Sequence, residues 1–361
     1  GRRGSGFMLV REIGPTDVHS GYLAAADFND DGDLDFVFTN RDDLLNVWLG
    51  QGNGRFDEAG QYPIGERFWD ITTADLDGDG HADVLVTNVD TRDISLLRGD
   101  GLGGFAPEIR LPIGEAPLDI EAGDLDGDGV VDVVVTNNLR GFVLPGVDGG
   151  LPGPARAFDI PASPTHTILS DLDADGAPDL LMTNTSERRL VVMLGDGVGG
   201  FGAPVLIPVG GRPGRIATGD LNGDRRIDVV LGFLDGHDVS VLLGTGDGDF
   251  APPLFVRGGQ DPEEVALGDF NGDGDLDLAV ANTIGAAGSG PDDVAIRLNQ
   301  CGTFAGCLAD LDGDGVLTIF DFLAFQNLFD LADPRADFDG DGAFTIFDIL
   351  AFQNAFDAGC P

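Results

Sequence analysis

Oxygen-bearing side chains recur at fixed positions in six acidic loops of this chain. Each loop has the pattern D-x-[DN]-x-D-x-x-x-D, and successive loops begin 48, 49, 47, 49 and 49 residues apart. Ca²⁺ takes about six to eight oxygen ligands in a flexible shell, and a tight turn with alternate carboxylates supplies them. The pattern therefore predicts six calcium sites. The predicted ligands, at positions one, three, five and nine of each loop, are Asp27, Asn29, Asp31 and Asp35; Asp75, Asp77, Asp79 and Asp83; Asp124, Asp126, Asp128 and Asp132; Asp171, Asp173, Asp175 and Asp179; Asp220, Asn222, Asp224 and Asp228; and Asp269, Asn271, Asp273 and Asp277.

A glycine stands at the sixth position of all but one of these loops, where a tight turn needs a positive φ. These glycines are Gly32, Gly80, Gly129, Gly176 and Gly274. The fifth loop instead has Arg225, followed by Arg226, so we expect its site to be the weakest or empty. For a single copy, a solvated acidic turn is the alternative interpretation. The constant register of the copies favours metal binding.

Short apolar segments flank every loop and must position it. Around the second loop they are residues 70–74 before it and residues 84–88, 94–97 and a segment that ends near 112–114 after it. The segments are rich in β-branched residues and are bounded by Gly, Asp and Pro, which is typical of strands. Four short strands in each unit of about 40–50 residues indicate a propeller blade. The sequence therefore predicts an all-β fold, a β-propeller of six blades.

The sixth unit supplies only three strands, and the last of them lies at residues 294–298. Residues 6–14 read like the fourth strand of a preceding unit. If they pair with the third strand of the sixth unit, six complete blades close into a ring, which removes the exposed edges of the first and last blades. A ring of seven blades is the alternative, if a blade precedes Gly1.

Residues 6–299 resemble the FG-GAP or VCBS-type repeats of calcium-binding β-propellers, such as the heads of integrin α-subunits. Motifs such as D-L-D-G-D-G at 124–129 and G-G-F-G-A-P at 199–204 carry the resemblance. It implies that the calcium loops lie in the hairpin between the first two strands of each blade, on the lower face. It also implies that a glycan or protein ligand binds on the opposite face.

Dissimilar polar residues stand five positions before the first Asp of the acidic loops. In a propeller, the innermost strand begins at this position, near the axis on the upper face. Such side chains around one opening could form a ligand pocket. Ordinary solvated turn residues are the alternative. The residues of this possible ligand ring are Tyr22, Asp70, Asp119, His166, Arg215 and Glu264.

Two longer acidic loops follow a connector of small residues at 300–306. Their oxygen ligands stand at positions 1, 3, 5, 9 and 12, which is the spacing of an EF-hand loop. Each loop runs into a helical pattern of apolar residues spaced i, i+3 and i+7. The apolar residues are Phe322, Phe325 and Phe329, then Ile349, Phe352 and Phe356. The predicted ligands, which raise the expected number of Ca²⁺ ions to as many as eight, are Asp310, Asp312, Asp314, Thr318 and Asp321, then Asp337, Asp339, Asp341, Thr345 and Asp348.

A duplicated loop with an exiting helix resembles a dockerin domain, so residues 307–361 are predicted to form a second domain. The resemblance implies attachment to a cohesin-like or cell-surface scaffold protein. Positions 10 and 11 of the loops carry Ile319-Phe320 and Ile346-Phe347, where cellulosomal dockerins usually present small polar recognition residues. The partner is therefore expected to differ from a standard cellulosomal cohesin. Alternatively, these side chains fill the core of the domain.

All three cysteines lie after residue 300. Cys307 and Cys360 each follow Ala-Gly, and a disulfide between them would clasp the ends of the duplicated domain. Three cysteines allow three single bridges, and this choice leaves Cys301 as the spare one. A disulfide implies an oxidising compartment.

The charge of the chain excludes some partners. With 63 acidic and 20 basic residues, the formal net charge is −43. Nucleic acids and anionic membranes require a basic surface, so binding to either is disfavoured. No apolar run is long enough to span a bilayer.

These features lead us to expect a secreted or surface-attached, calcium-binding and non-catalytic recognition or adhesion module. An extracellular polysaccharide-degrading lyase or hydrolase is the alternative, with its catalytic residues in the possible ligand ring. A purely structural or surface-layer component is the third class. Failure to bind any glycan or protein would favour that third class.

Overall fold

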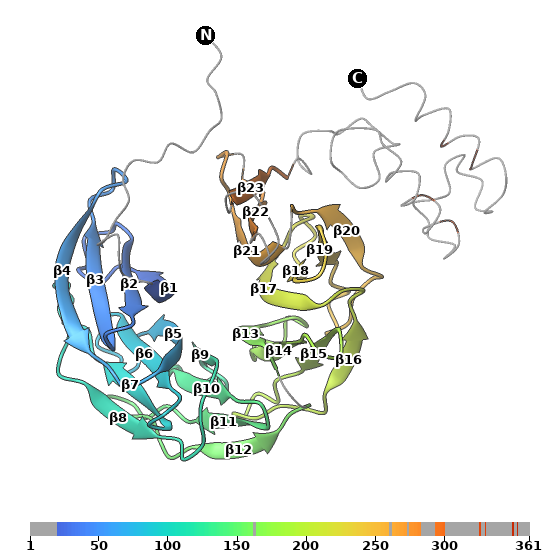
Figure 1. Cartoon of the computed structure of the whole chain (residues 1–361). Helices are drawn as coiled ribbons and strands as arrows, with labels where there is room; N and C mark the ends of the chain where they lie inside the picture. Colours follow the sequence, from blue (N-terminus) through green and yellow to red (C-terminus); the bar gives the residue numbers. More distant parts are fainter. Residues whose placement is uncertain are drawn as a thin grey trace, which may run out of the picture. The chain divides into compact units, whose positions relative to one another are not determined.

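The computed structural model describes most of the propeller region and four residues beyond it. The described residues are 20–161, 164–259, 262–272, 274–282 and 293–299, with Phe325, Phe329, Ile349 and Phe352. They form six antiparallel sheets, of which five have four strands and one has three (Figure 1). In each sheet the strands follow one another in chain order, as in a propeller blade. The prediction of an all-β fold with six propeller blades is confirmed.

The blades are numbered in chain order, and their strands have these bounds. Blade 1 has β1 (Ser20–Ala26), β2 (Asp35–Asn40), β3 (Leu44–Gly50) and β4 (Phe56–Pro63); blade 2 has β5 (Phe68–Ala74), β6 (Asp83–Asn88), β7 (Asp93–Leu97) and β8 (Ile109–Pro112); blade 3 has β9 (Ile120–Gly123), β10 (Asp132–Thr136), β11 (Arg140–Leu144) and β12 (Arg156–Asp159). Blade 4 has β13 (His166–Ser170), β14 (Asp179–Asn184), β15 (Arg189–Met193) and β16 (Val205–Pro208); blade 5 has β17 (Pro213–Gly219), β18 (Asp228–Phe233), β19 (Asp238–Leu242) and β20 (Leu254–Arg257); blade 6 has β21 (Pro262–Gly268), β22 (Asp277–Asn282) and β23 (Asp293–Arg297).

The second strand of a blade is covered on both faces. Every residue of β6, which reads DVLVTN, is buried, and β14 and β18 show the same pattern. A continuous run of aliphatic and β-branched residues is typical of such a strand. Successive side chains point to opposite faces. Val84 and Val86 therefore pack with residues of blade 1, whereas Leu85 packs with residues of blade 3.

The glycine turn between the third and fourth strands is anchored by the aromatic residue that ends it. Phe105 forms an isolated bridge with Gly99, and its ring lies 5.5 Å from that of Phe28, in the first acidic loop. The N–H of Gly103 also donates a hydrogen bond of 2.9 Å to the carbonyl of Phe28. These contacts connect the turn of blade 2 to the acidic loop of blade 1.

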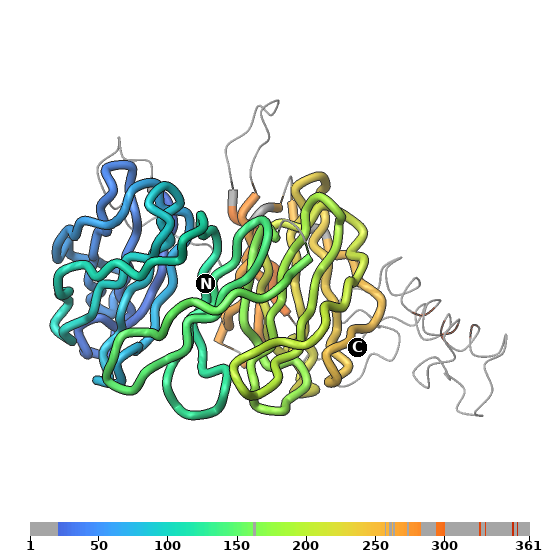
Figure 2. The backbone as a smooth tube through the Cα atoms, turned by 90° about the horizontal axis from the view of Figure 1, so that it is seen from below, coloured from blue at the N-terminus to red at the C-terminus, as the bar shows by residue number. Residues whose placement is uncertain are grey.

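The chain divides into two compact units, each treated by itself below. The first consists of Gly1–Ile216, Phe233–Asp235 and Gly246–Asp249, and the second of Ala217–Gly232, Gly236–Thr245 and Phe250–Pro361. The blades of the first unit run from blue to green, and their strands extend between two rims of turns (Figure 2). One rim carries the acidic loops, because these connect the first and second strands.

Several predictions concern residues outside the described part of the chain. They are the closing strand at 6–14 with its choice between six and seven blades, the connector at 300–306, the two C-terminal acidic loops and the pairing of the cysteines. All of these remain predictions.

Four described residues belong to the predicted C-terminal helical patterns. Phe325, Phe329, Ile349 and Phe352 are all in helical conformation. The rings of Phe325 and Phe352 are buried and stacked, with centroids 4.3 Å apart, and the rings of Phe325 and Phe329 lie 5.7 Å apart. Apolar positions of the two predicted patterns therefore contact each other. Among the described residues, no helix has the length and apolar character needed to cross a membrane.

Candidate functional site

Each acidic loop is built around the carboxylate of its first Asp. In loop 2, Oδ1 of Asp75 accepts hydrogen bonds from the N–H groups of Gly78 (2.8 Å) and Asp79 (3.2 Å), and Oδ2 accepts one from Gly80 (2.9 Å). The fifth residue, Asp79, accepts a bond of 2.9 Å from the N–H of His81. Asp side chains that bond to backbone N–H groups a few residues onward are typical of such turns. The chain therefore wraps around its own carboxylates.

Two positions of every loop have a positive φ. Among the predicted glycines, φ is 92° at Gly80 and 84° at Gly129, and the Arg225 that replaces glycine in loop 5 has a φ of 67°. The fourth position has the same requirement, with a φ of 57° at Asp30 and 60° at Ala174. The glycine pattern of the sequence predicts the sixth position but not the fourth.

The ninth Asp of a loop anchors it to the blade. Asp83 is buried, and its Oδ2 accepts a bond of 3.1 Å from the N–H of Leu76 while its Oδ1 accepts one of 2.9 Å from Gly99. Burial raises the pKa of Asp83 to about 6, although these two bonds oppose the shift. The equivalent aspartates accept the same pair of backbone bonds and are Asp35, Asp132, Asp179, Asp228 and Asp277.

Three loops bring carboxylates together closely enough to hold one cation. In each of three groups, one oxygen from every carboxylate lies within 4.8 Å of the others. The groups are Asp75, Asp77 and Asp79; Asp124, Asp126 and Asp132; and Asp171, Asp173 and Asp179. Oδ1 of Asp77 and Oδ1 of Asp171 are buried and have no hydrogen-bond partner among the described residues. An all-oxygen donor set with orphaned oxygens fits a calcium ion.

The remaining propeller loops differ in ways that the sequence explains. Loops 1 and 5 carry Asn at the third position, and its amide nitrogen donates to the fifth-position Asp, over 2.9 Å from Asn29 and 3.3 Å from Asn222. In loop 5 the side chain of Arg226 also lies 4.0 Å from Asp224. In loop 6, Asp273 lies outside the described residues.

A guanidinium enters loop 2, which the sequence analysis did not anticipate. Nη1 of Arg98 lies 3.1 Å from Oδ2 of Asp77, and Nη2 of Arg98 donates a hydrogen bond of 2.8 Å to the carbonyl of Gly150. Arg98 directly follows the buried apolar strand β7. A single Arg in this place belongs to no sequence motif that would predict its contact with the loop. Arg98 supplies this loop with a fixed positive charge.

All but one of the residues of the possible ligand ring belong to the first unit. Tyr22 lies on β1, Asp70 on β5, Asp119 immediately before β9, His166 on β13 and Arg215 on β17. The innermost strands contact one another in the order β1, β5, β9 and β13 (Figure 1). The residues of the first unit are called the axial cluster below. Glu264 lies on β21 of the second unit and is exposed.

Irregular strand pairing interrupts the normal alternation of side-chain direction at Tyr22 and Asp70. The register of β1 and β2 shifts between Ser20 and Leu23, around Tyr22, and a similar shift in blade 2 surrounds Asp70. Such bulges redirect side chains and occur often beside functional sites. The displaced N–H groups of Tyr22 and Asp70 donate instead to threonine hydroxyls of the second strand, at 3.0 and 2.9 Å.

Members of the axial cluster also join neighbouring blades. Oδ2 of Asp70 accepts a bond of 3.1 Å from the N–H of Ile120, and Nδ1 of His166 accepts one of 3.2 Å from the N–H of Ile216. Asp119 accepts hydrogen bonds from both the hydroxyl and the N–H of Thr167. These residues are therefore fixed in position and are not solvated turn residues.

Burial sets the protonation of the axial cluster. It raises the pKa of Asp119 to about 8, with help from the nearby charge of Asp70 and against the effect of Arg215. Burial and the charges of Asp70 and Asp119 raise the pKa of Glu121 to about 8 as well. Burial, followed by the charge of Arg215, lowers the pKa of His166 to about 3. At neutral pH the cluster thus contains neutral carboxylic acids and a neutral imidazole.

Aromatic rings border the cluster on one side. The guanidinium carbon of Arg215 lies 5.5 Å from the ring centroid of Tyr22, which is within cation–π range. The centroid of Trp69 lies 6.5 Å from that of Tyr22, and Trp69 is 40% exposed. The cluster therefore combines hydrogen-bond donors and acceptors with an accessible aromatic surface.

The repeat motif identifies the family of the chain. The family model of the FG-GAP-like repeat matches residues 27–86, 75–135, 171–231 and 220–280, which together make up more than half of the chain and contain all six acidic loops. The chain belongs to the FG-GAP-like repeat family. No curated protein matches it.

Solved structures share the fold of this FG-GAP-like propeller. A lectin of Agrocybe aegerita, whose structure concerns recognition of non-reducing terminal N-acetylglucosamine, is 22% identical, with 75% of this chain and 79% of that chain covered and a TM-score of 0.54. Virginiamycin B lyase of Staphylococcus aureus is 17% identical, with 75% and 80% covered and a TM-score of 0.50. A protein of Lactobacillus plantarum is 14% identical, with 73% and 77% covered and a TM-score of 0.52.

Two residues near the axial cluster, Glu121 and Trp69, are not predicted as site residues from the sequence. Glu121 follows Asp119 by two residues, and alternation along a strand places such residues on one face. Trp69 precedes Asp70 directly and is brought to the surface beside Tyr22. The threonines of the second strands recur in register and could have been found as a repeat signal; they are Thr39, Thr87, Thr136 and Thr183.

Proposed function

We propose that this FG-GAP-like propeller is a secreted, calcium-stabilised recognition module that binds a glycan at the axial cluster. The observation that carries the proposal is the convergence of dissimilar polar residues from five successive blades in one unit. Calcium ions in the acidic loops would hold the rim opposite to this site and fix the blades. The bound ions would supply charge neutralisation there and take no part in ligand binding.

The chemistry of the axial cluster suits a sugar ring. Sugars present hydroxyl groups, which donate and accept hydrogen bonds, and apolar C–H faces. At neutral pH the protonated Asp119 and Glu121 can each donate a hydrogen bond, whereas the guanidinium of Arg215 only donates. The exposed face of Trp69 offers an apolar surface to the C–H face of the ring. The lectin of similar fold supports the choice of glycans as the first ligands to try.

A binding screen tests the proposal. The full chain in millimolar calcium is screened against immobilised glycans, including those that end in N-acetylglucosamine, and against soluble polysaccharides. The variant Trp69→Ala is expected to lose binding. Phe255→Ala is the matched control, because Phe255 is 47% exposed and lies in the second unit. Equal binding by wild type and Trp69→Ala would place the ligand elsewhere, and no binding by wild type would refute the proposal.

A second function, an extracellular polysaccharide lyase or hydrolase, is favoured by one observation. Asp119 of the axial cluster and Glu121, two residues after it, both have a pKa of about 8, and an acid that is protonated at neutral pH can act as a general acid. Asp119 is bound by Thr167, so Glu121 is the better candidate. Release of sugars by wild type, lost in Glu121→Gln, would establish an enzyme. Binding without release would establish a recognition module.

For the C-terminal segment, we propose that residues 307–361 attach the propeller to a cohesin-like or cell-surface scaffold protein in calcium. The support is the sequence resemblance to a dockerin domain. Capture of a cell-surface or scaffold protein of the source organism by the full chain is expected in calcium and is expected to disappear with chelator. Replacing Ile319-Phe320 and Ile346-Phe347 by Ser-Thr should abolish capture if they are recognition residues. If the variant instead unfolds, these side chains form the core of the domain.

A further inference from the structure

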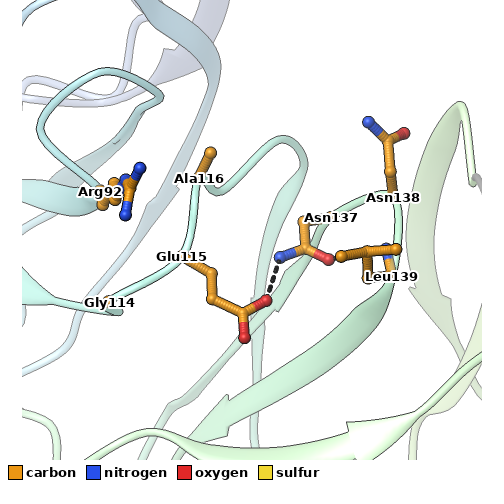
Figure 3. A pocket seen from close by; sticks show the side chains of 7 residues that line it. All are labelled: Arg92, Gly114, Glu115, Ala116, Asn137, Asn138 and Leu139. Carbon is orange, nitrogen blue, oxygen red and sulfur yellow. Dashed lines mark hydrogen bonds between the residues drawn. The ribbon is translucent and has the colours of Figure 1, made fainter.

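A hollow of about 340 Å³ opens between connections of blades 2 and 3, in the first unit (Figure 3). Its walls come from the turn between β6 and β7, the connection from β8 to β9, and the turn between β10 and β11. These connections lie at the ends of the strands opposite to the acidic loops. The residues that line it include Arg92, Glu115, Ala116, Asn137, Asn138 and Leu139.

Backbone geometry shows which residues of other blades are structurally equivalent to Arg92. Arg92 has a φ of 60°, and its carbonyl accepts a bond of 3.1 Å from the N–H of Ile113. Asp43 of blade 1 and Arg188 of blade 4 have φ values of 55° and 57° and accept the equivalent bonds. These three residues therefore occupy one structural position in their blades.

In the other two copies of this position, ion pairs and hydrogen bonds join arginines and carboxylates. In one copy, Nη1 of Arg67 lies 3.2 Å from Oδ1 of Asp90, and the N–H of Arg67 lies 3.3 Å from Oδ1 of Asp43. In the other copy, Nη2 of Arg188 lies 2.9 Å from Oδ2 of Asp235. The N–H of Arg212 also donates to Oδ1 of Asp235 over 2.8 Å.

At the hollow both charged residues are replaced. Ala116 stands three residues before Asp119, as Arg67 stands before Asp70, and Leu139 stands two residues after Asn137, as Asp90 stands after Asn88. Arg92 therefore lacks the carboxylate that Arg188 has in Asp235. It has no ion pair with any of the described residues, and its side chain lines the hollow.

The carboxylate that lines the hollow already has partners. Oε2 of Glu115 accepts a bond of 3.1 Å from Nδ2 of Asn137 (Figure 3). Oε1 of Glu115 lies 3.6 Å from Nε of Arg140. The lining of the hollow thus includes the Glu115–Asn137 pair, an exposed carboxamide from Asn138, an apolar side chain from Leu139 and the guanidinium of Arg92, which has no ion pair with the described residues.

We propose that this hollow binds a carboxylate-bearing sugar residue, a uronate, as a second subsite of the glycan-binding face. The ligand carboxylate would take the place that the Asp235 carboxylate has beside Arg188, in a charge-assisted hydrogen bond to Arg92. The carboxamide of Asn138 and the Glu115–Asn137 pair suit sugar hydroxyls, which a peptide carboxylate would not provide. The inference rests on the proposed glycan-binding function.

The test uses the full chain in calcium with methyl glucuronide and methyl glucoside as probes, followed by ligand-observed NMR and calorimetry. Wild type is expected to prefer the glucuronide at least fivefold. Arg92→Gln should remove that preference. Leu139→Asp should weaken glucuronide binding at least fivefold, because it restores the carboxylate that Asp90 and Asp235 supply at this position in blades 2 and 5.

Controls separate this inference from the proposed function. Trp69→Ala should retain glucuronide binding at the hollow while losing glycans bound at the axial cluster. If axial glycans bind but Arg92→Gln leaves the preference for glucuronide unchanged, the hollow is not a uronate site and the proposed function stands. If an Asp-rich peptide competes through Arg92 and the glucuronide does not, the partner is a protein and the inference is wrong.

Discussion

Nη1 of Arg98 lies 3.1 Å from Oδ2 of Asp77, the third residue of acidic loop 2. The residues equivalent to Arg98 in blades 1, 3, 4 and 5 are Leu49, Pro145, Leu194 and Leu243, respectively. Only loop 2 among these five therefore receives a positive charge from its own blade at this position. The guanidinium and a calcium ion would compete for the same carboxylate group.

Replacing Arg98 by Met should strengthen calcium binding at loop 2 by roughly threefold to tenfold, because a nearby like charge is removed. The calcium-free protein should become less stable, because Asp77 loses its counterion. Calcium titration by calorimetry measures the first effect, and urea unfolding in chelator measures the second. Arg188→Met is the matched control, since it breaks an ion pair on the opposite rim. An unchanged calcium isotherm would refute the competition.

Replacing Arg225 by Gly should stabilise loop 5. Arg225 has a φ of 67°, a conformation that costs an L-residue about 1 kcal/mol and glycine very little. The substitution also removes a positive charge beside the predicted ligands, so calcium should bind more tightly. The reciprocal variant Gly176→Arg should destabilise loop 4 by a similar amount. Thermal unfolding with and without calcium compares the two, and stabilisation by both substitutions would contradict the conformational argument.

Removal of calcium should lower the melting temperature of the full chain by about 10 °C or more. Without metal, three of the loops hold carboxylates within 4.8 Å of one another, and their like charges repel. Differential scanning calorimetry in chelator, and again after calcium is restored, measures the effect. Restoring Na⁺ alone is the control. An unchanged melting curve, together with metal analysis that finds no calcium in the native protein, would overturn the calcium proposal.

The repeat made most of the fold predictable from the sequence. The sequence contains six copies of one loop, each flanked by short apolar runs, and this pattern predicts the order of the strands. The predicted calcium ligands follow from the spacing of Asp and Asn within each loop. The local signal at a residue such as Asp70 did not show what it bonds to, because its partner, the N–H of Ile120, belongs to the next blade. Such contacts depend on blade packing and have no signature within one repeat.

Departures from the repeat were harder to interpret than the repeat itself. Arg98 and Glu121 occur once each, and their importance comes from neighbours distant in the sequence. The hollow at Arg92 arises because Ala116 and Leu139 replace charged residues of other blades. The replacements are visible in the sequence only after backbone geometry has shown which residues are equivalent.

Glu121→Gln should change how stability depends on pH. Burial raises the pKa of Glu121 from 4.5 to about 8, so between these values the folded protein retains a proton that the unfolded chain has lost. The unfolded state then binds fewer protons, and stability falls as the pH rises. Glutamine has no such proton to lose. The variant should match wild type near pH 4.5, gain on it as the pH increases, and be more stable by roughly 5 kcal/mol above pH 8, because the interval between the unfolded and folded pKa values counts about 1.4 kcal/mol per pH unit.

Urea unfolding between pH 4.5 and 9 in saturating calcium measures this difference, because effects of pH on the calcium loops are common to both proteins. Glu187→Gln is the matched control, since Glu187 is exposed on a turn of the same unit and its variant should run parallel to wild type at every pH. Burial also raises the pKa of Asp119 to about 8, so the pH dependence that remains in Glu121→Gln belongs in part to Asp119. Asp119→Asn in the Glu121→Gln background should therefore flatten the remaining slope. If Glu121→Gln is instead least stable relative to wild type at high pH, the carboxylate of Glu121 is ionised and paired in the folded protein. The axial cluster would then contain a fixed anion in place of a neutral hydrogen-bond donor.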